Sequence, residues 1–395
     1  MTAKAIHLKP ARVWTDGATH DGWRVLVRGG RIAALGANVE AGDARVVDLA
    51  GLTLLPGLMD LHSHLFLHPY NETPWDDQVL KESEAYRTVR AVRHAEAALR
   101  AGFTCLRDLG TEGAGYADVA IKRAIEKGII PGPRLFVVTR AIVATGSYGP
   151  ARAKFRPDCC FPQGAEEASG IDEVVRAVRH QASHGADWIK VYADYRAGPG
   201  GETVATFSVD ELKALVEASH SLGRPVAAHA TSDEGMRRAA LAGVDTIEHG
   251  YGGSRETFAL MRKNNIAYLP TLTVCVALCE YFHGYVRGSE PHPRMVEAAN
   301  AFRTAREEGV VTGLGSDVGP FPHGENLREL RWMERLGMSR DEALLAATAV
   351  NAKILRREHE LGSVKPGYLA DLIATANDLD VRFVMNDGTV YSAFR

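Results

Sequence analysis

The sequence predicts an α/β protein, namely a (β/α)8 TIM barrel with a small β-sandwich domain formed from both termini. Three observations predict this fold. Short apolar runs alternate with longer amphipathic stretches in the middle of the chain, both ends carry strand-and-turn patterns, and 395 residues are too many for one small core. We place the composite small domain at residues 1–55 and 360–395 and the barrel at residues 56–359.

The two ends of the chain have the pattern of short strands. Residues 24–28 and 31–36 flank Gly29-Gly30, which is a hairpin signal, and residues 46–51 add another strand. Near the other end, residues 369–374 and 381–385 are strand-like. Neither end could bury a core alone, so we predict that they share one β-domain.

The middle of the chain alternates between apolar runs of strand length and helical patterns. The predicted strands are residues 54–62, 102–109, 134–140, 187–193, 224–230, 245–249, 267–273 and 312–317. The predicted helices are residues 82–100, 117–126, 171–184, 209–222, 233–241, 255–263, 294–307 and 327–335. Eight strands alternating with helices favour the barrel. An open doubly wound sheet is the alternative, but no Gly-x-Gly-x-x-Gly follows the first strand.

Local signals support the helix ends. Ser208 with Glu211 and Ser339 with Glu342 fit the capping-box pattern. Several helical runs are followed by a glycine, where a left-handed residue is expected: Gly128, Gly185, Gly223, Gly243, Gly309 and Gly337. Residues 144–169 have no period and contain several Gly and Pro residues, so we predict a long functional loop after the third strand.

Composition narrows the class of protein. Apolar residues make up 46% and charged residues 24% of the chain, and the net charge is -3. This balance gives no reason to expect nucleic acid or membrane as a partner, and the start of the chain lacks an apolar signal region. Five cysteines do not predict a disulfide framework in a chain of this length. We therefore expect a cytoplasmic enzyme with a small-molecule substrate, and a homo-oligomer is compatible with the sequence.

Ionisable side chains gather at the predicted strand ends. His62 and His64 project to the same face of the first strand, about 6–7 Å apart. An isolated His-x-His is more often two polar residues at a strand exit, but other strands of the predicted barrel supply Lys190, His229, His249 and Asp317. Because catalytic residues of such barrels lie at the carboxyl ends of the strands, the joint pattern indicates a metal site.

This pattern resembles the amidohydrolase superfamily. Residues 55–60, Leu-Pro-Gly-Leu-Met-Asp, and residues 362–372, Gly-Ser-Val-Lys-Pro-Gly-Tyr-Leu-Ala-Asp-Leu, are similar to the segments that flank the barrel in that superfamily. The resemblance covers nearly the whole chain. Within the superfamily it is to the imidazolonepropionase-like branch that includes Xaa-Pro dipeptidases.

The resemblance implies two divalent metals, zinc in the first place, with manganese, iron or cobalt as alternatives. His62 and His64 would bind one metal with Asp317, and His229 and His249 would bind the second. Imidazole nitrogen and carboxylate oxygen are ligands that zinc accepts.

Lys190 would bridge both metals as a carbamate formed with CO2. A free ammonium cannot bind a cation, whereas a carbamate is an anionic ligand with two oxygens. Burial lowers the pKa of a lysine and makes its neutral amine available to react. Superfamily members with one metal, many of them deaminases, tend to lack this lysine, so Lys190 favours two metals and hydrolysis.

The implied activity is hydrolysis of a C–N amide bond in a small molecule by a metal-bridging hydroxide, with Asp317 as the catalytic proton shuttle. A dipeptide, an N-acyl amino acid or a xenobiotic amide could be the substrate. A lactone, carbamate, phosphate ester or cyclic amide could be cut at the same site, and a deaminase is a weaker alternative. A non-catalytic assembly protein on this fold would tend to lose ligands, and here all six positions are filled.

The substrate contacts are expected in loops. Related dipeptidases often show Thr-Gly-Gly-His after the third strand and a tyrosine two residues after the strand-five histidine, whereas this chain has Thr-Gly-Ser-Tyr-Gly at 145–149 and Thr231. We predict Tyr148 and His323 as substrate-binding residues; Tyr148 packed in its loop is the alternative. Arg152, Lys154 and Arg156 could bind a substrate carboxylate, although a solvated charged face is favoured.

Overall fold

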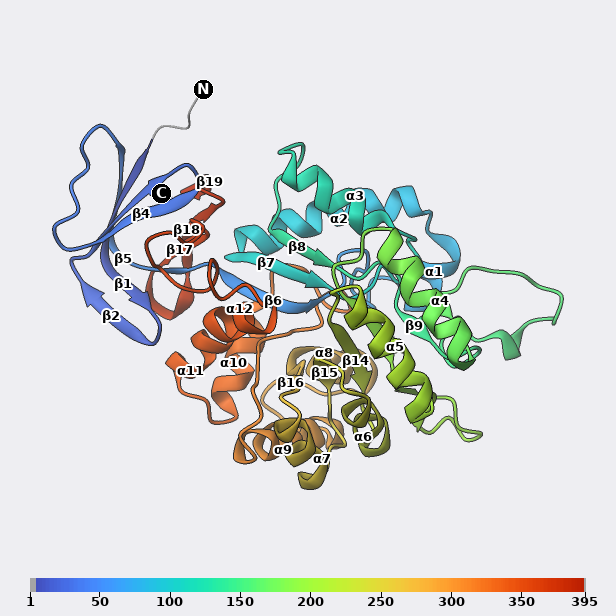
Figure 1. Ribbon diagram of the computed structural model, residues 1–395. Coiled ribbons are helices and arrows are strands. Elements are labelled where there is room, and N and C mark those ends of the chain that lie inside the picture. Colours follow the sequence, from blue (N-terminus) through green and yellow to red (C-terminus); the bar gives the residue numbers. More distant parts are fainter. Residues whose placement is uncertain (1–4, 394–395) are drawn as a thin grey trace.

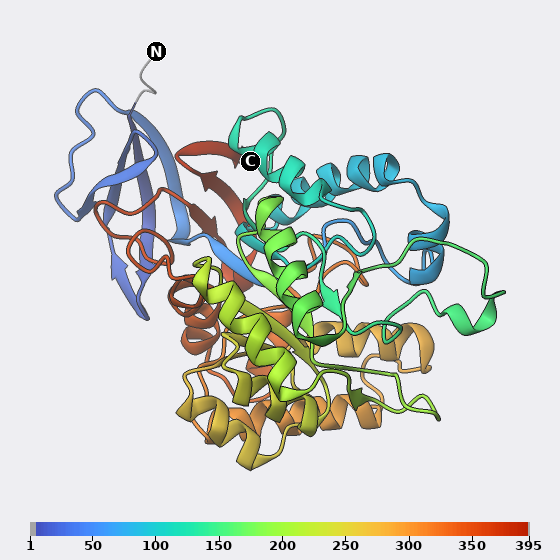
Figure 2. The same cartoon turned by 45° about the vertical axis from the view of Figure 1, so that its right-hand side comes forward.

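The computed structural model describes residues 5–393 and has a TIM-barrel-like α/β fold. Figure 1 shows two regions: a β-sheet that contains both β1 and β19, and a group of strands surrounded by helices. The view in Figure 2 shows the same separation. Among the described residues, no helix has the length and apolar character needed to cross a membrane.

The first region is one sheet of eight strands from both ends of the chain. Its order is β19-β18-β17-β5-β1-β3-β4, with β2 paired to β1. The strands are β1 (Ile6–Thr15), β2 (Ala18–Asp21), β3 (Arg24–Arg28), β4 (Arg31–Gly36), β5 (Arg45–Pro56), β17 (Leu372–Thr375), β18 (Val381–Asn386) and β19 (Thr389–Ala393). Strand β5 joins the halves because it pairs with β1 in parallel and with β17 antiparallel. The predicted pairing of the two ends is therefore present, and the domain boundaries themselves stay a prediction.

Alternating apolar side chains give this sheet its own core. Leu8, Val25, Leu54 and Phe383 are fully buried in it. Strand β5 continues from this sheet into the first strand of the second region through Gly57. A Cβ atom at Gly57 would lie 2.0 Å from the side-chain oxygen of Thr104, so only glycine fits this crossing.

The second region is built from parallel strands. Two sheets, in the orders β6-β7-β8 and β10-β9-β11-β14-β15-β16, make it up. Their bounds are β6 (Leu58–Ser63), β7 (Phe103–Asp108), β8 (Arg134–Val137), β9 (Ile142–Val143), β10 (Glu166–Glu167), β11 (Ile189–Tyr192), β14 (Val226–Ala230), β15 (Thr246–His249) and β16 (Ala267–Leu269). Backbone N–H groups of Asp187 and Trp188 donate to the carbonyl of Val137, which links the two sheets on one side.

The predicted eighth strand, residues 312–317, closes the other side without being a regular strand. Thr312 bridges Tyr268 of β16, and Val318 bridges Ser63 of β6. Between them, the side chain of Asn351 donates to the carbonyl of Leu314 and accepts from its N–H. The assignment as a strand is therefore wrong in detail, because an amide side chain replaces part of the backbone ladder.

Helices cover the strands on the outside (Figure 1). The helices are α1 (Trp75–Lys81), α2 (Glu84–Arg100), α3 (Ala117–Glu126), α4 (Gly170–Ser183), α5 (Val209–Ser221), α6 (Asp233–Ala242), α7 (Arg255–Lys263), α8 (Leu272–Phe282), α9 (Pro293–Glu307), α10 (Leu327–Arg335), α11 (Arg340–Leu345) and α12 (Asn351–Ile354), with a π-helical turn at Ala346–Val350 and 3₁₀ turns at Arg152–Lys154 and Asn377–Leu379. Capping boxes at Ser208 and Ser339 are present as predicted. The glycines predicted to follow helices all have positive φ.

The predicted strand at 267–273 is too long, because α8 begins at Leu272. The N–H groups of Leu272 and Thr273 donate to the buried carboxylate of Glu329 at 2.9 and 2.7 Å. These are donors that a helix start leaves without an intrahelical partner. The carboxylate comes from α10, far away in the sequence, so no local pattern could predict it.

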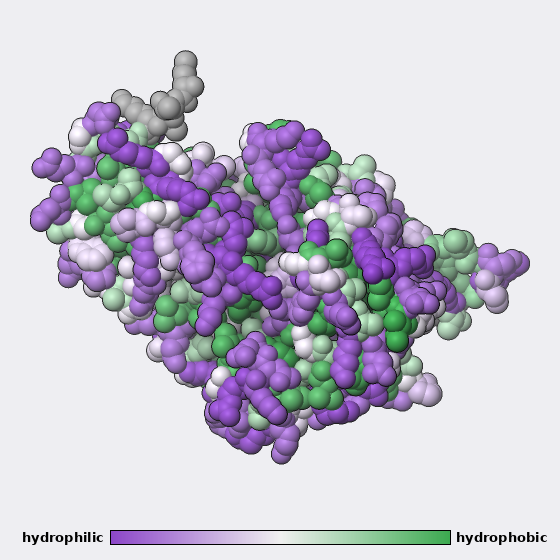
Figure 3. All heavy atoms as spheres, viewed as in Figure 1, coloured by the Kyte–Doolittle hydropathy of each residue, from purple (hydrophilic) through white to green (hydrophobic). Residues whose placement is uncertain are grey.

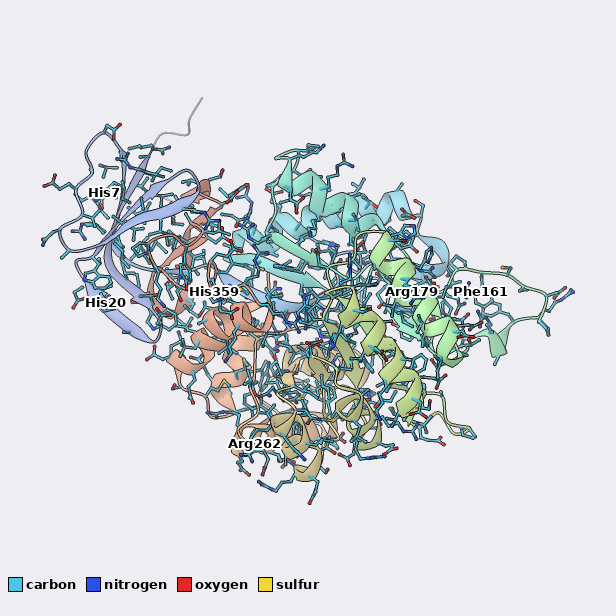
Figure 4. The ribbon with its side chains drawn as sticks, viewed as in Figure 1. His7, His20, Phe161, Arg179, Arg262 and His359 are labelled. Atoms are coloured by element: carbon cyan, nitrogen blue, oxygen red, sulfur yellow. The ribbon has the colours of Figure 1, made fainter. Side chains whose placement is uncertain are left out.

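The loop at 144–169 extends from the body of the protein (Figure 1). It carries a 3₁₀ turn and the short strand β10, which pairs with β9. Figure 4 labels Phe161 in this loop, where its ring lies 4.8 Å from that of Phe155. A two-stranded hairpin of β12 (Asp194–Tyr195) and β13 (Val204–Ala205) follows β11. In Figure 3, hydrophilic side chains are spread over the viewed face with apolar ones between them.

Candidate active site

Four histidines meet at the carboxyl ends of the parallel strands. The rings of His62 and His64 lie 5.4 Å apart, and that of His62 lies 5.0 Å from that of His249. The ring of His229 lies 4.5 Å from that of His249. Each residue lies at or just past the end of a strand, so the barrel-like order of β6, β14 and β15 brings the four together.

Asp317 faces three of these histidines. One carboxylate oxygen lies 3.5 Å from Nε2 of His62 and 3.4 Å from Nε2 of His64. The other lies 3.9 Å from Nδ1 of His249. Ligand atoms of His62, His249 and Asp317 all lie within 4.8 Å of one another, a spacing that could hold a metal ion. We call the four histidines, Asp317 and Lys190 the strand-end cluster.

Lys190 lies inside the protein without a hydrogen-bond partner. Its side chain is buried, and its Nζ makes no hydrogen bond to the described residues. Burial lowers the pKa of Lys190 to about 8, against the attraction of Glu248 and Asp317. A buried amine without a partner is costly, so this position calls for a ligand or a modification.

Hydrogen bonds fix the orientation of the first two histidines. Nδ1 of His62 donates to Glu248 at 2.8 Å, and Nδ1 of His64 donates to the carbonyl of Gly110 at 2.9 Å. Both residues therefore present the lone pair of Nε2 toward Asp317. Glu248 in turn accepts from the buried Arg107 at 2.8 Å. The sequence pattern gave no sign of the role of Arg107.

The last two histidines have different supports. Nδ1 of His249 lies 2.8 Å from the hydroxyl oxygen of Thr271. The ring of His229 stacks on Tyr192 at 4.4 Å, and its Nε2 lies 3.7 Å from Asp194. Tyr192 follows Lys190 by two residues in β11, so the period of a strand could have placed it at the site.

Backbone conformation is unusual at two members of the cluster. His249 and Asp317 have backbone φ values of 71° and 59°, which residues other than glycine rarely adopt. Such conformations persist only where the surroundings enforce them, and they gather at functional sites. Asp60 is part of these surroundings. Its carboxylate accepts from the N–H of Ser316 at 2.9 Å and from Asn326 at 2.7 Å, which holds the Asp317 segment against β6.

Burial sets the protonation of the cluster. It lowers the pKa of all four histidines, to about 4 for His64. It raises the pKa of Asp317 to about 7, while Lys190 acts in the opposite direction. The histidines are therefore neutral at pH 7, and neutral imidazole is the form that binds metals.

One cavity adjoins the cluster, and it shares lining residues with a second cavity. The cluster cavity, of about 580 Å³, is lined by His229, His249 and Asp317 together with loop residues. The aromatic cavity, of about 690 Å³, is lined by residues that include Trp75 and Tyr148. Both volumes lie in the range of small-molecule sites.

Tyr148 lines the aromatic cavity, but its hydroxyl is engaged. It donates to Glu112 at 2.6 Å, and Nε1 of Trp75 donates to the same carboxylate oxygen at 3.1 Å. The Tyr148 ring packs against those of Trp75 and Tyr192. The hydroxyl of Tyr148 is therefore held by Glu112, and the role of Tyr148 as a substrate contact stays a prediction. Glu112, which links these residues, was not found from the sequence.

His323 is not among the residues that line the two cavities. Its ring stacks on that of His94 at a centroid distance of 4.1 Å, and its Nε2 donates to the carbonyl of Leu67 at 3.1 Å. It is half-buried and lies against the segment that follows β6. Its role as a substrate contact stays a prediction.

Comparisons with known proteins identify the family. A model of the amidohydrolase family matches residues 53–394, and the chain belongs to this family. Ochratoxinase of Aspergillus niger is 31% identical over 343 residues, which cover 81% of this chain and 69% of that protein. Imidazolonepropionase of Symbiobacterium thermophilum is 26% identical over 412 residues, covering 95% and 89%.

A solved structure is similar over nearly the full length. It is that of a Xaa-Pro dipeptidase with bound methionine in the active site, 30% identical, with a TM-score of 0.88 and coverage of 99% of this chain and 100% of that one. These relatives confirm the predicted branch of the superfamily. The protein is therefore a hydrolase, and its family generally uses divalent metals.

Proposed function

We propose that this hydrolase cleaves the C–N amide bond of a small molecule with two divalent metals. The proposed substrates are dipeptides, N-acyl amino acids or xenobiotic amides. Membership of the amidohydrolase family and the similarity to a Xaa-Pro dipeptidase support amide hydrolysis. The observation that carries the metal proposal is the buried Nζ of Lys190. It has no hydrogen-bond partner among the described residues and lies next to four neutral histidines and a carboxylate.

The donor set fits such a centre. His62, His64 and Asp317 would hold one metal, and His229 and His249 would hold the other. Zinc is the first choice because it accepts imidazole and carboxylate together, and manganese, iron and cobalt remain alternatives. When bound, the metals would acidify water and polarise the substrate carbonyl.

Lys190 would complete the set as a carbamate. Its neutral amine would form an N–C bond with CO2 and release a proton, which yields an anionic ligand with two oxygens. Burial favours this step because it lowers the pKa of Lys190 to about 8 and thus raises the share of neutral amine at pH 7. The product would also satisfy the unpartnered position of Nζ.

Asp317 is the proposed proton shuttle. Its carboxylate would take a proton from the attacking water and deliver it to the leaving amine nitrogen, so that the departing group is a neutral amine. The distances of 3.4 and 3.5 Å to His64 and His62 support a position at the centre of the cluster. Tyr148 and His323 are kept as predicted substrate contacts.

The architecture that we propose for the protein is a (β/α)8 barrel beside a β-sandwich, with the domain boundaries predicted from the sequence. The closing hydrogen bonds of residues 310–318 to β16 and β6 support the barrel. The cytoplasmic location and the oligomeric state stay predictions.

Metal analysis combined with a substrate panel tests the proposal. We expect close to two equivalents of zinc or manganese in the protein and release of an amine from N-acyl amino acids or dipeptides. Lys190→Ala should lose metal and activity, with partial rescue by short carboxylic acids. His220→Gln is a matched control, because His220 pairs with Asp245 on the surface, and it should keep full metal content.

The same panel separates the alternatives. Cleavage of lactones, carbamates or phosphate esters without any amide cleavage would show that the enzyme does not cut an amide bond. Ammonia release from aminated heterocycles would indicate a deaminase. Well under one equivalent of metal in carefully prepared protein would favour a non-catalytic role.

A further inference from the structure

We infer that the substrate carries an anionic group, held by Arg196 and Arg294 where the two cavities meet. This inference rests on the proposed amide hydrolysis and narrows its substrate class to N-acyl amino acids with a free carboxylate and an aromatic or bulky apolar part. Both arginines line both cavities, as do Tyr195 and Leu278. They thus mark the junction between the cluster cavity and the aromatic cavity.

The two arginines lack the partners that other arginines in the region have. Both are exposed, and within residues 5–393 neither has a carboxylate oxygen within 4.0 Å of its guanidinium group. By contrast, Arg152 of the same aromatic cavity pairs with Glu167 at 2.5 Å, and Arg328 pairs with Glu280 at 3.3 Å. Two arginines that line one junction, neither paired with a carboxylate among the described residues, form the inferred site for an external anion.

Acidic groups nearby do not occupy this junction. Asp76 lines only the aromatic cavity, and Glu297 lines only the cluster cavity. Asp233, also in the cluster cavity, accepts from the backbone N–H of Ser254 at 2.8 Å. The junction itself is therefore the point where positive charge prevails.

The order of the cavities places the anion relative to the reacting bond. The cluster cavity holds His229, His249 and Asp317, so the scissile amide belongs there. Beyond the junction, the rings of Trp75 and Tyr148 offer apolar and stacking surfaces. A matching substrate has its carboxylate close to the amide and an aromatic group beyond it, which is the layout of an N-acyl aromatic amino acid.

The size of the site supports a substrate of two parts. Cavities of about 580 and 690 Å³ exceed what a dipeptide of small residues would fill. The carboxylate at the junction would fix the register of both parts. A guanidinium fork suits this task because it binds carboxylate with two parallel hydrogen bonds.

A matched pair of substrates tests the inference on the metal-loaded enzyme. N-benzoyl-L-phenylalanine carries the carboxylate, and N-benzoyl-2-phenylethylamine lacks only this group. We expect the acid to be preferred at least tenfold in kcat/KM. Arg196→Gln and Arg294→Gln should each lower kcat/KM for the acid about tenfold, mainly through KM, and change the value for the neutral amide less than twofold. Arg328→Gln is the control, because Arg328 pairs with Glu280 and lines neither cavity, and this variant should keep the preference for the acid.

Salt and binding give two further readouts. Because both arginines are exposed, raising sodium chloride from 50 to 500 mM should raise KM for the acid severalfold and leave that for the neutral amide unchanged. Calorimetric titration of N-benzoyl-L-phenylalanine into the Asp317→Asn variant should show binding that either arginine substitution weakens about tenfold.

The outcomes separate the inference from the proposed function. Equal cleavage of both amides, with no effect of either arginine substitution, would overturn the inference and leave amide hydrolysis intact. If no amide is cleaved by the metal-loaded enzyme, the proposed function fails, and the titration alone then decides whether the arginines bind a carboxylate. Titration without binding, or binding that is unaffected by both substitutions, would contradict the anion site.

Discussion

The strand-end cluster and the junction of the two cavities differ in how their side chains are held. His62 and His64 each donate a hydrogen bond to a buried acceptor, at 2.8 and 2.9 Å, so their rings cannot turn freely. Arg196 and Arg294 are exposed and have no carboxylate partner among the described residues. Under the proposed function and the inferred anion site, side chains fixed at strand ends carry the chemistry, and exposed side chains on a loop and a helix select the substrate.

The largest effect should come from the centre of the cluster. Asp317→Asn removes the proposed proton shuttle but keeps the volume of the side chain. We expect kcat to fall by about 10²–10⁴-fold, the usual contribution of a positioned acid–base group, while at least one metal equivalent stays bound. Steady-state kinetics with metal analysis of the same sample measures both. Normal turnover in this variant would refute the shuttle role.

Glu248→Gln tests whether the rigid support of the cluster matters. The substitution leaves the buried Arg107 without its carboxylate, and breaking a buried ion pair costs about 3–5 kcal/mol of unfolding free energy. It also weakens the orientation of His62, so metal affinity should fall about 10–100-fold. Chemical denaturation and competition with a chelator measure the two losses. Glu234→Gln, which alters a surface ion pair with Arg237, is the control.

A smaller effect is expected at the edge of the aromatic cavity. Tyr148→Phe keeps the ring but removes a hydrogen bond to the buried Glu112, so the unfolding free energy should fall by about 1–3 kcal/mol while KM changes little. Tyr148→Ala removes the ring as well and should also raise KM. If Tyr148→Phe instead lowers kcat strongly at unchanged stability, the hydroxyl takes part in the reaction, and the expectation that only the ring contacts the substrate is wrong.

The last effect appears only at acid pH and concerns the pH dependence of stability. Burial lowers the pKa of His94, which stacks on His323, to about 4. Between pH 6.5 and 4 the unfolded chain binds a proton at this residue and the folded chain does not, so stability is full above pH 6.5 and falls as the pH drops. The loss is at most about 3 kcal/mol at 1.36 kcal/mol per pKa unit.

His94→Gln should make this acid-side decline shallower. Glutamine can still donate to the carbonyl of Leu65, which His94 does at 2.8 Å, but it does not titrate. Urea denaturation at pH 7 and pH 5 measures the difference in unfolding free energy. An unchanged difference would show that other buried histidines control the acid side.

The contrast between cluster and junction also explains what the sequence could predict. Strand periodicity and the chain order of β6, β11, β14 and β15 were enough to bring His62, Lys190 and His229 to one end of the strands. The capping boxes at Ser208 and Ser339 follow local rules, and both are present. Local and periodic signals thus predicted most of the elements and the candidate ligands.

Other features depend on contacts between distant segments. The side chain of Asn351 bonds to Leu314 in place of part of the predicted eighth strand. Glu329 accepts hydrogen bonds from the first residues of α8, so the strand predicted at 267–273 is shorter than expected. Arg196 and Arg294 lie almost 100 positions apart and follow no shared pattern. Both arginines line one junction because of the conformation of a loop and the position of a helix, and no periodic pattern in the sequence predicts this.

The loop arginines show the same limit. The sequence offered Arg152, Lys154 and Arg156 as carboxylate ligands or as a solvated charged face. The structure pairs Arg152 with Glu167 and Arg156 with Asp158, which agrees with the charged face, and the side chain of Lys154 lies outside the described part. Which cations remain available to a substrate depends on which carboxylates neutralise the others in space.

The central claim is that the strand-end cluster holds two metals bridged by a modified Lys190. A crystal structure of the protein prepared with zinc, with anomalous data collected above and below the zinc edge, tests it most directly. We predict two anomalous peaks among His62, His64, His229, His249 and Asp317, and additional density on Nζ of Lys190 that reaches both. A single peak with an unmodified Lys190, or peaks only outside the cluster, would contradict the account.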